Sequence, residues 1–213
     1  MKQWLYKLAG AITILSTLFF LLGVSPAFAS TLGYTTQGGS TLGFVGGRVY
    51  CYGVVAPSNG TINDIQANVS AAAGKTFSLK PIVTDQAGPN ILTNGIGNAS
   101  GVIGNTSKHW ETLTYTTGPT IVSGQSYYLC VIDNAATFGD GLLSQDNLGG
   151  TPGWEDTTPN SYASPTSPLG GGLFSLSASI YADYTPSGSA VTHTLLVQTK
   201  GKVVHNKGTF IIQ

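Results

Sequence analysis

A period-two alternation of apolar and polar residues, repeated in short runs, constrains the fold of this chain more than any other feature. Between Thr61 and Ser70, for example, Ile65, Ala67 and Val69 alternate with polar residues. Successive side chains of a strand point to opposite faces, so each such run predicts a strand with one buried face. The runs are separated by clusters of Gly, Pro, Asn and Asp, which favour tight turns. Helical periodicity is almost absent, so we expect an all-β fold.

Particular runs also predict how the strands are placed. Residues 126–133 are apolar on both faces, which is typical of a central strand covered on both sides. From Phe174 to Tyr184 every second residue is apolar, and a one-residue shift would expose that whole set, so we expect a fixed register. Pro81 lacks a backbone N–H and predicts an edge strand. About seven to nine short strands over residues 30–185 predict a two-layer antiparallel β-sandwich that is jelly-roll-like.

Residues 1–29 have the organisation of an export signal. Lys2 and Lys7 accompany an uncharged, mainly apolar run, and Ala27-Phe28-Ala29 then supplies the small residues that signal peptidase requires. We predict cleavage before Ser30 and a secreted protein, either extracellular or at the bacterial cell surface. The alternative is an uncleaved anchor, because the apolar run approaches the roughly 18 residues that span a bilayer. No later stretch is long and apolar enough to do so, and we expect no membrane association after cleavage.

The charge of the chain is low and unevenly distributed. Basic and acidic residues number 9 each, and charged residues make up 8% of the chain, without the basic stripe of a nucleic-acid-binding protein. Residues 30–185 hold four basic and all nine acidic residues, a net charge of −5. Residues 186–213 hold three Lys and no acidic residue, a net charge of +3. This asymmetry predicts a boundary near residue 186, with a sandwich domain before it and a separate tail after it.

The tail, residues 186–213, is predicted to form a β-hairpin. Two apolar runs, 191–198 and 202–213, flank Lys200-Gly201-Lys202, which is suited to the turn. A two-stranded hairpin is marginal alone in water, so we expect it to dock. It would pair either with its own sandwich or with a second subunit, in which case residues 191–213 would mediate self-association.

Cys51 and Cys130 are the only two cysteines. An exported chain meets an oxidising compartment, so we predict that they form a disulfide. The bridge would close a loop of about 80 residues and stabilise the fold by about 4 kcal/mol in the chain-entropy model. The alternative is a pair of buried thiols that pack as small apolar groups.

The polar segment from Asn134 to Gly172 is unusually long for a connection in a compact domain, and such segments are either functional or disordered. We expect it to face solvent. Exposed aromatic rings could stack on sugar rings while short polar side chains bind hydroxyl groups. The alternative is that the rings, Phe138 among them, fold back and pin the segment, whereas Trp110 is expected in the core. The candidate ligand-binding residues are Trp154, Tyr162, Asp146, Asn147, Glu155, Asp156 and Asn160.

At this point three segments of the chain resemble a known group of modules. They are Ala56-Pro57-Ser58-Asn59-Gly60-Thr61-Ile62, the run His109-Trp110-Glu111-Thr112-Leu113-Thr114-Tyr115 with the later 121–129, and the closing 176–184. Their order is similar to that of jelly-roll modules of the carbohydrate-binding kind, found in bacterial secreted and phage structural proteins. The resemblance covers roughly residues 40–185. It implies a β-sandwich that binds or adheres, and it supplies no catalytic residues.

Metal binding and catalysis have weaker support in the sequence. Asp133, Asp140 and Asp146 offer the oxygen ligands that calcium prefers, but their spacing is not that of an EF-hand, and ordinary turn residues are the alternative. We expect no other cofactor. No Gly-x-Ser-x-Gly motif is present, and spacing alone pairs no two carboxylates for glycoside hydrolysis.

The sequence therefore predicts a secreted, non-enzymatic binding or adhesion module that recognises carbohydrate or another cell-surface polymer through its aromatic-bearing segment. A first alternative is a structural subunit of an extracellular assembly that uses the C-terminal hairpin for strand pairing. A second alternative is a small secreted glycoside hydrolase.

Overall fold

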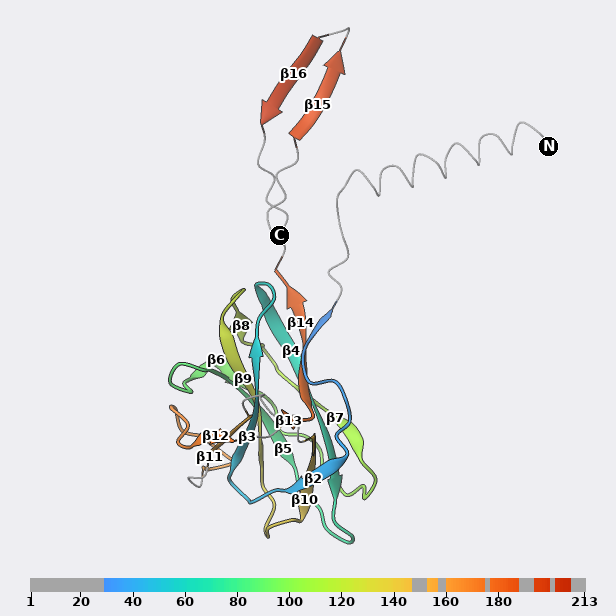
Figure 1. The fold of residues 1–213 in the computed structure, drawn as a ribbon, viewed down its shortest axis with the longest axis vertical. Helices are drawn as coiled ribbons and strands as arrows, with labels where there is room; N and C mark the ends of the chain where they lie inside the picture. The colour runs from blue at the N-terminus through green and yellow to red at the C-terminus, as the bar shows by residue number, and fades with distance from the viewer. Residues whose placement is uncertain are drawn as a thin grey trace, which may run out of the picture. The chain divides into compact units, whose positions relative to one another are not determined.

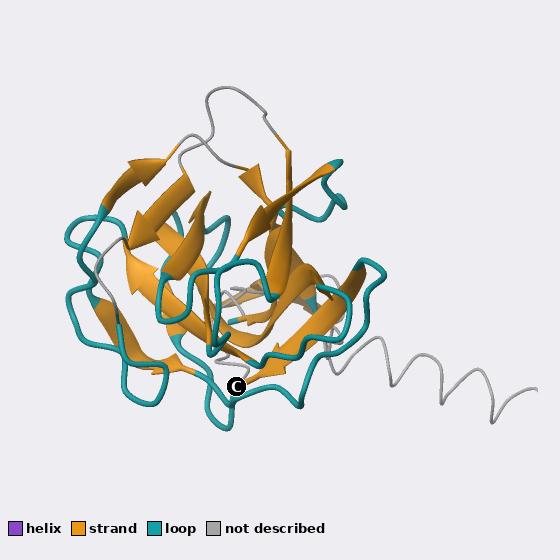
Figure 2. Cartoon of the chain, turned by 90° about the horizontal axis from the view of Figure 1, so that it is seen from below, coloured by secondary structure: helices purple, strands orange, loops and turns teal. Residues whose placement is uncertain are grey.

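The computed structural model describes residues 29–146, 153–156, 160–174, 177–187, 194–199 and 202–207. The predicted export signal lies almost entirely outside these residues. The described chain consists of strands and the turns and loops between them (Figure 2). Within these ranges, no helix has the length and apolar character needed to cross a membrane.

The strands between residues 30 and 186 form two antiparallel sheets, in which sequence-distant strands pair (Figure 1). In the first, sheet A, β14 and β10 flank β4, which also pairs with β7 and β8. Sheet A contains β1 (Ser30–Gly33), β2 (Ser40–Gly43), β4 (Gly60–Ala71), β7 (His109–Thr114), β8 (Thr120–Ile121), β10 (Gly141–Asp146), β13 (Ser177–Ala178) and β14 (Ile180–Pro186). Sheet B has the order β12 (Gly172–Phe174), β11 (Gly153–Asp156), β3 (Val49–Val55), β9 (Ser126–Asp133), β5 (Leu79–Asp85) and β6 (Ile91–Ile96).

The two sheets pack against each other around one apolar core. Ile65, Ala67 and Val69, the alternating residues of β4, are fully buried there. From sheet B, Leu129 and Val131 of β9 join the same cluster. The apolar residues share the inner face because their period matches that of a strand. The predicted two-layer antiparallel β-sandwich is therefore confirmed.

Strand β9 occupies the centre of sheet B, between β3 and β5. Its odd-numbered residues from Tyr127 to Val131 face the sandwich core, whereas Tyr128, Cys130 and Ile132 form a second apolar cluster. Leu169 is 4% exposed and belongs to this second cluster. The prediction of a strand covered on both faces is confirmed, and the segment 160–171 supplies the outer cover.

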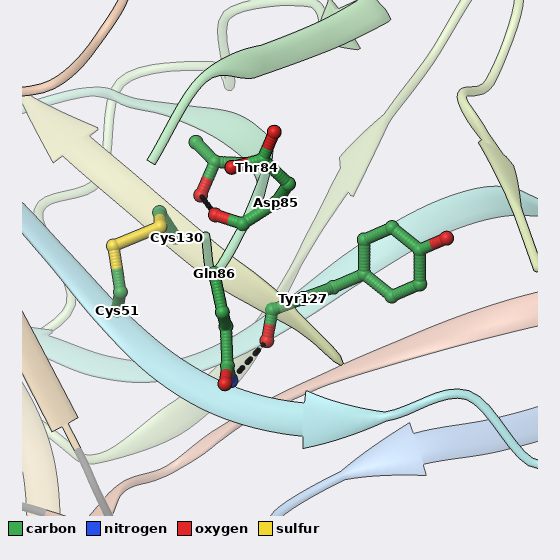
Figure 3. Close-up of a disulfide and its surroundings, with 6 residues drawn as sticks. All are labelled: Cys51, Thr84, Asp85, Gln86, Tyr127 and Cys130. Atoms are coloured by element: carbon green, nitrogen blue, oxygen red, sulfur yellow. Dashed lines mark hydrogen bonds between the residues drawn. A yellow bond between two sulfur atoms is a disulfide. The ribbon is translucent and has the colours of Figure 1, made fainter. Parts of the chain in front are cut away.

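Cys51 and Cys130 form the predicted disulfide (Figure 3). They lie directly opposite each other on β3 and β9, so the bridge joins neighbouring strands of one sheet. On the same sheet, the Gln86 side-chain amide donates to the Tyr127 carbonyl oxygen over 2.8 Å (Figure 3). The bridge thus fixes the register of the central strand pair.

The expectation that Pro81 lies on an edge strand is wrong, since β5 pairs with β9 on one side and β6 on the other. The ladder between β5 and β6 is irregular between Ile82 and Thr84. The Pro81 carbonyl still accepts a hydrogen bond from the Gly97 amide over 3.0 Å. An irregular ladder tolerates the absent proline N–H, which a regular interior ladder would not.

The final alternating run is divided between the sheets. Ala178, Ile180, Ala182 and Tyr184 are buried in the core as predicted, but Gly172–Phe174 belongs to sheet B. The chain therefore changes sheet within this run. Polar residues on the other face are buried too. Ser179 is fully buried, and its amide donates to the Ser144 carbonyl over 2.9 Å.

The segment from residue 134 to residue 172 is not one solvent-facing loop. Strand β10 lies in sheet A beside β4, with Leu143 fully buried, and β11 pairs with β3 in sheet B. Residues 160–170 contain both exposed and buried positions. The polar composition of the segment did not predict these strands, because each strand is short and pairs with strands that are distant in the sequence.

The C-terminal residues form the predicted hairpin. Strands β15 (Thr194–Thr199) and β16 (Lys202–Lys207) are antiparallel, and Thr199 lies opposite Lys202. Residues Ala29–Ser187 form one compact unit, distinct from the residues that follow it.

Candidate functional site

An open cavity of about 470 Å³ lies at one end of the sandwich, where β9 ends at Asp133. Its walls come from the loop before β3, from the residues that follow β9 and from the segment before β12. We call it the Asp133 cavity. It is lined by Val45, Gly46, Gly47, Asp133, Asn134, Ala135, Ala136, Phe138, Asn160 and Tyr162.

Two glycines allow the walls of the cavity to approach each other. The Gly47 amide donates to the Asp133 carbonyl over 3.3 Å, and the Gly47 carbonyl accepts from the Asn160 amide over 2.7 Å. Gly47 has φ of +78°, and a Cβ there would lie 2.5 Å from the Asn160 carbonyl oxygen. A Cβ on Gly46 would overlap the Ala135 carbonyl oxygen. The site therefore requires glycine at both positions.

Asp133 is one of the residues that line this cavity, and its side chain is fully buried. Its Oδ1 accepts a hydrogen bond from the Ala135 amide over 2.8 Å, whereas Oδ2 has no hydrogen-bond partner among the described residues. Burial raises the pKa of the carboxyl group to about 6, although the Ala135 amide opposes the shift. A buried acceptor without a partner is costly, which makes such a group informative about function.

The cavity carries two aromatic rings that differ in exposure to solvent. Tyr162 is half-buried, and its hydroxyl donates to the Leu79 carbonyl over 3.2 Å. The Lys80 ammonium lies 4.8 Å from the centre of the same ring and donates to the Tyr162 carbonyl over 2.8 Å. Burial, and then the charge of Asp133, raise the pKa of the Tyr162 phenol. Phe138, in contrast, is 69% exposed and presents a ring to solvent.

Two asparagines complete the polar lining. Asn134 is exposed, and its Oδ1 accepts a hydrogen bond from the Ser78 amide over 2.6 Å, which orients the carboxamide. The Asn160 Oδ1 accepts from the Thr166 amide and hydroxyl over 2.9 and 2.8 Å. These contacts hold both side chains in place before any ligand binds.

The structure brings together only part of the predicted ligand-binding set. Tyr162 and Asn160 line the cavity, whereas Asp146 lies on β10 and is not among the lining residues. The backbone of β11 carries Trp154, Glu155 and Asp156 beside β3. The side chains of these three residues, and Asn147 as a whole, lie outside the described residues.

The three aspartates proposed as calcium ligands each have separate partners. Asp140 lies 3.3 Å from the Lys75 ammonium, and Asp133 is buried at the cavity. Asp146 accepts from the Tyr34 hydroxyl over 2.6 Å and from the Gly39 amide over 2.8 Å, which lower the pKa of its carboxyl group. Across the residues that the structure describes, no three acidic, His or Cys side chains form a metal-binding group.

A second polar and aromatic surface lies on the outer face of sheet A. Trp110 is half-buried there rather than in the core, and its ring centre lies 5.0 Å from that of Tyr181. Asp183 lies directly opposite Asp64, and burial together with the charge of Asp64 raises the pKa of Asp183. Gln66 donates to the Asp64 carboxylate over 3.0 Å. These residues are not among those that line the Asp133 cavity.

Sequence reasoning considered Asn134 only as an oxygen ligand for calcium, and it missed the two glycines of the Asp133 cavity. The signal that could have found the cavity is the dipeptide Asp133-Asn134 directly after a strand that is apolar on both faces. A charged residue that continues such a strand is buried by its neighbours.

The chain matches no protein-family model and no curated protein. Its function is therefore argued from the geometry of the Asp133 cavity.

Proposed function

We propose that this protein is a secreted, non-enzymatic binding module that recognises carbohydrate through the Asp133 cavity. The observation that carries the proposal is the combination of a buried, half-satisfied carboxylate with an exposed aromatic ring around one concave site. Ligand sites generally pair an apolar wall with a few well-placed polar groups. A sugar ring offers the complement, an apolar face bordered by hydroxyl groups.

The roles of the lining residues follow from their contacts. Phe138 provides the exposed surface on which a sugar ring would stack. Asn134, held through its Oδ1 by the Ser78 amide, keeps its NH2 group for a hydroxyl oxygen. Asp133 holds a negative charge behind the lining of the cavity, and this charge attracts the hydrogens of hydroxyl groups. Because hydrogen bonds hold Asn134 and Asp133 before binding, these two side chains lose little conformational entropy on association.

Binding is favoured over hydrolysis by the number of carboxylates. Glycoside hydrolysis requires a pair of carboxyl groups on either side of the scissile bond. Of the side chains that the structure describes, Asp133 is the one carboxylate that lines the cavity. Secretion is supported by the export-signal pattern of residues 1–29 and by the disulfide, which is typical of oxidising compartments.

A glycan array followed by calorimetry with the best ligand tests this function. Phe138→Ala should weaken binding at least about tenfold, because the stacking surface is lost. Val122→Ala is the matched control, since Val122 is 50% exposed and lies close to the start of β9, at the other end of the strand from Asp133. Equal binding by both variants and the wild type would refute the placement of the site.

Assembly through the tail is a second candidate function, favoured by the C-terminal hairpin. β15 and β16 pair only with each other among the described strands, and a lone two-stranded hairpin is marginal in water. Pairing with a further strand would stabilise it. Light scattering of the full chain and of a chain that ends at Ser187 tests this function. If both are monomeric at the same concentration, assembly through the tail is refuted.

A further inference from the structure

Among the described residues that line the cavity, no cation balances the charge of Asp133. No Lys or Arg side chain is among the lining residues. The groups that set the pKa of the carboxyl are its burial and backbone hydrogen bonds, with no contribution from a positive charge. A buried, unbalanced carboxylate favours a ligand that brings a positive charge over one that brings only a hydroxyl group.

The charged and titratable groups on the neighbouring elements have contacts of their own. Lys80, on β5, donates to the Tyr162 and Ala163 carbonyls over 2.8 and 3.2 Å. Arg48, just before β3, is also engaged in an interaction. The Tyr162 phenol donates to a backbone carbonyl and is neutral at physiological pH, because its pKa is raised. None of these groups neutralises Asp133 across the cavity.

The other lysines of the domain are also occupied. Lys75 pairs with Asp140 over 3.3 Å, and Lys108 donates to the carbonyls of Gly38, Gly39 and Ser40. With four basic and nine acidic residues, the stretch 30–185 carries a net charge of −5. Its field therefore attracts cations and repels anions at low salt.

On the premise that the Asp133 cavity binds carbohydrate, we propose that it selects an amino sugar, whose protonated amine occupies the cavity and is attracted by the buried Asp133 carboxylate. The ammonium group compensates the buried charge, which a hydroxyl group or an acetylated amine cannot do. Asn134 and Phe138 then contact the hydroxyl groups and the apolar face of the same sugar, as any pyranose would require. The cavity therefore distinguishes sugars by the substituent that faces Asp133.

Three β-1,4-linked tetrasaccharides test this selection, because they differ only in the substituent at carbon 2. The probes are the oligomers of glucosamine, N-acetylglucosamine and glucose, titrated calorimetrically into the full-length wild type at about pH 6.5. The glucosamine oligomer should bind at least about tenfold more tightly than either neutral oligomer. Asp133→Asn should bring the three affinities to within about twofold of one another, with the fold of the variant checked by circular dichroism.

Asp146→Asn is the matched control. It removes one negative charge from a partly exposed site outside the cavity, and it should leave the preference for glucosamine unchanged. If Asp146→Asn and Asp133→Asn weaken binding equally, the attraction is a general effect of net charge and the proposal is overturned. Calcium that binds to the wild type and displaces the glucosamine oligomer would also overturn it, in favour of a metal site.

The wild type alone supplies a further test, which holds even if Asp133→Asn does not fold. With a pKa of about 6, the ionised fraction of Asp133 falls from about three quarters at pH 6.5 to about 3% at pH 4.5. If only the ionised form binds the amine, the affinity falls roughly 25-fold over this interval. The amine becomes more protonated as pH falls, so its own titration opposes the decrease, and a fall in affinity reports the ionisation of Asp133. Affinity that does not fall with pH overturns the proposal.

Failure of this inference is distinguishable from failure of the proposed function. Equal affinities for the three oligomers, each lowered by Phe138→Ala, would overturn amino-sugar selection but keep carbohydrate binding at the cavity. Absence of binding by any sugar on the array or in calorimetry would overturn both.

Discussion

The unbalanced carboxylate of Asp133 should give this protein a characteristic dependence of stability on pH. In the folded state its pKa is about 6, compared with an ordinary value of 3.8. The folded state therefore holds the proton more tightly than the unfolded state. Below pH 3.8 both states are protonated and the group costs nothing. As pH rises towards 6 the unfolded state ionises first, so the free energy of unfolding falls.

The size of this effect follows from the two pKa values. A difference of about 2 units, at about 1.4 kcal/mol each, amounts to about 3 kcal/mol at neutral pH and above. Between pH 4.5 and pH 7.5, about 2 kcal/mol of this loss should appear. Asp133→Asn keeps the oxygen that accepts from the Ala135 amide but does not ionise. Relative to the wild type, the variant should therefore gain about 2 kcal/mol over that interval.

Urea unfolding of both proteins at the two pH values measures this difference. Asp146→Asn is the control, because the Asp146 carboxyl group should change stability with pH in the opposite direction. The pKa of Asp146 is lowered by the Tyr34 hydroxyl and the Gly39 amide, so its contribution to stability is lost as pH falls. If the stabilities of the wild type and Asp133→Asn change in parallel with pH, the carboxyl group is not buried as described and the reasoning is refuted.

Three further predictions concern the scaffold. Reduction of the disulfide, which spans a sequence separation of 79 residues, should lower the free energy of unfolding by about 4 kcal/mol in denaturant titrations. Gly47→Ala should destabilise the fold and weaken glycan binding, because the added Cβ meets the Asn160 carbonyl. Gly74→Ala is its control: φ there is similar, +71°, and no atom lies within 4 Å of the added Cβ, so this variant should show only the cost of a left-handed backbone conformation. Trp110→Ala should cost about 1 kcal/mol through lost ring packing but leave glycan affinity unchanged, and a loss of affinity would move the binding site to the outer face of sheet A.

The parts of the fold that could be predicted from sequence are those in which local pattern and burial agree. The alternation in β4 and the two apolar faces of β9 identify a sandwich and its central strand because the residue period alone determines which side chains are buried. The disulfide followed from the count of cysteines and the expected compartment. The structure then shows that Cys51 and Cys130 are direct cross-strand partners.

The parts that could not be predicted depend on contacts between distant segments. Strand β10 has one fully buried large apolar residue, Leu143, and its place in sheet A is set by pairing with β2 and β4. The cavity forms only where loops from three parts of the chain meet, so no single stretch encodes it.

For Trp110, the sequence did contain the information that places the residue on the outer face of sheet A. It shares its strand face with Thr112 and Thr114, and Leu113 occupies the opposite, buried face. The alternation of the strand therefore indicated an outer position for Trp110, whereas the size of its indole ring suggested the core. The alternation predicted the position of Trp110 better, because the backbone of a strand determines the face to which each side chain points.

A nuclear magnetic resonance titration of the isotope-labelled protein with the glucosamine tetrasaccharide tests the central claim most directly. The account predicts that the largest shifts of amide resonances come from Asp133, Asn134 and Phe138, together with residues 160–162. It also predicts that Tyr181 and its neighbours on the outer face of sheet A do not shift. Shifts confined to that outer face, or no shifts at millimolar sugar, would contradict the assignment of function to the cavity.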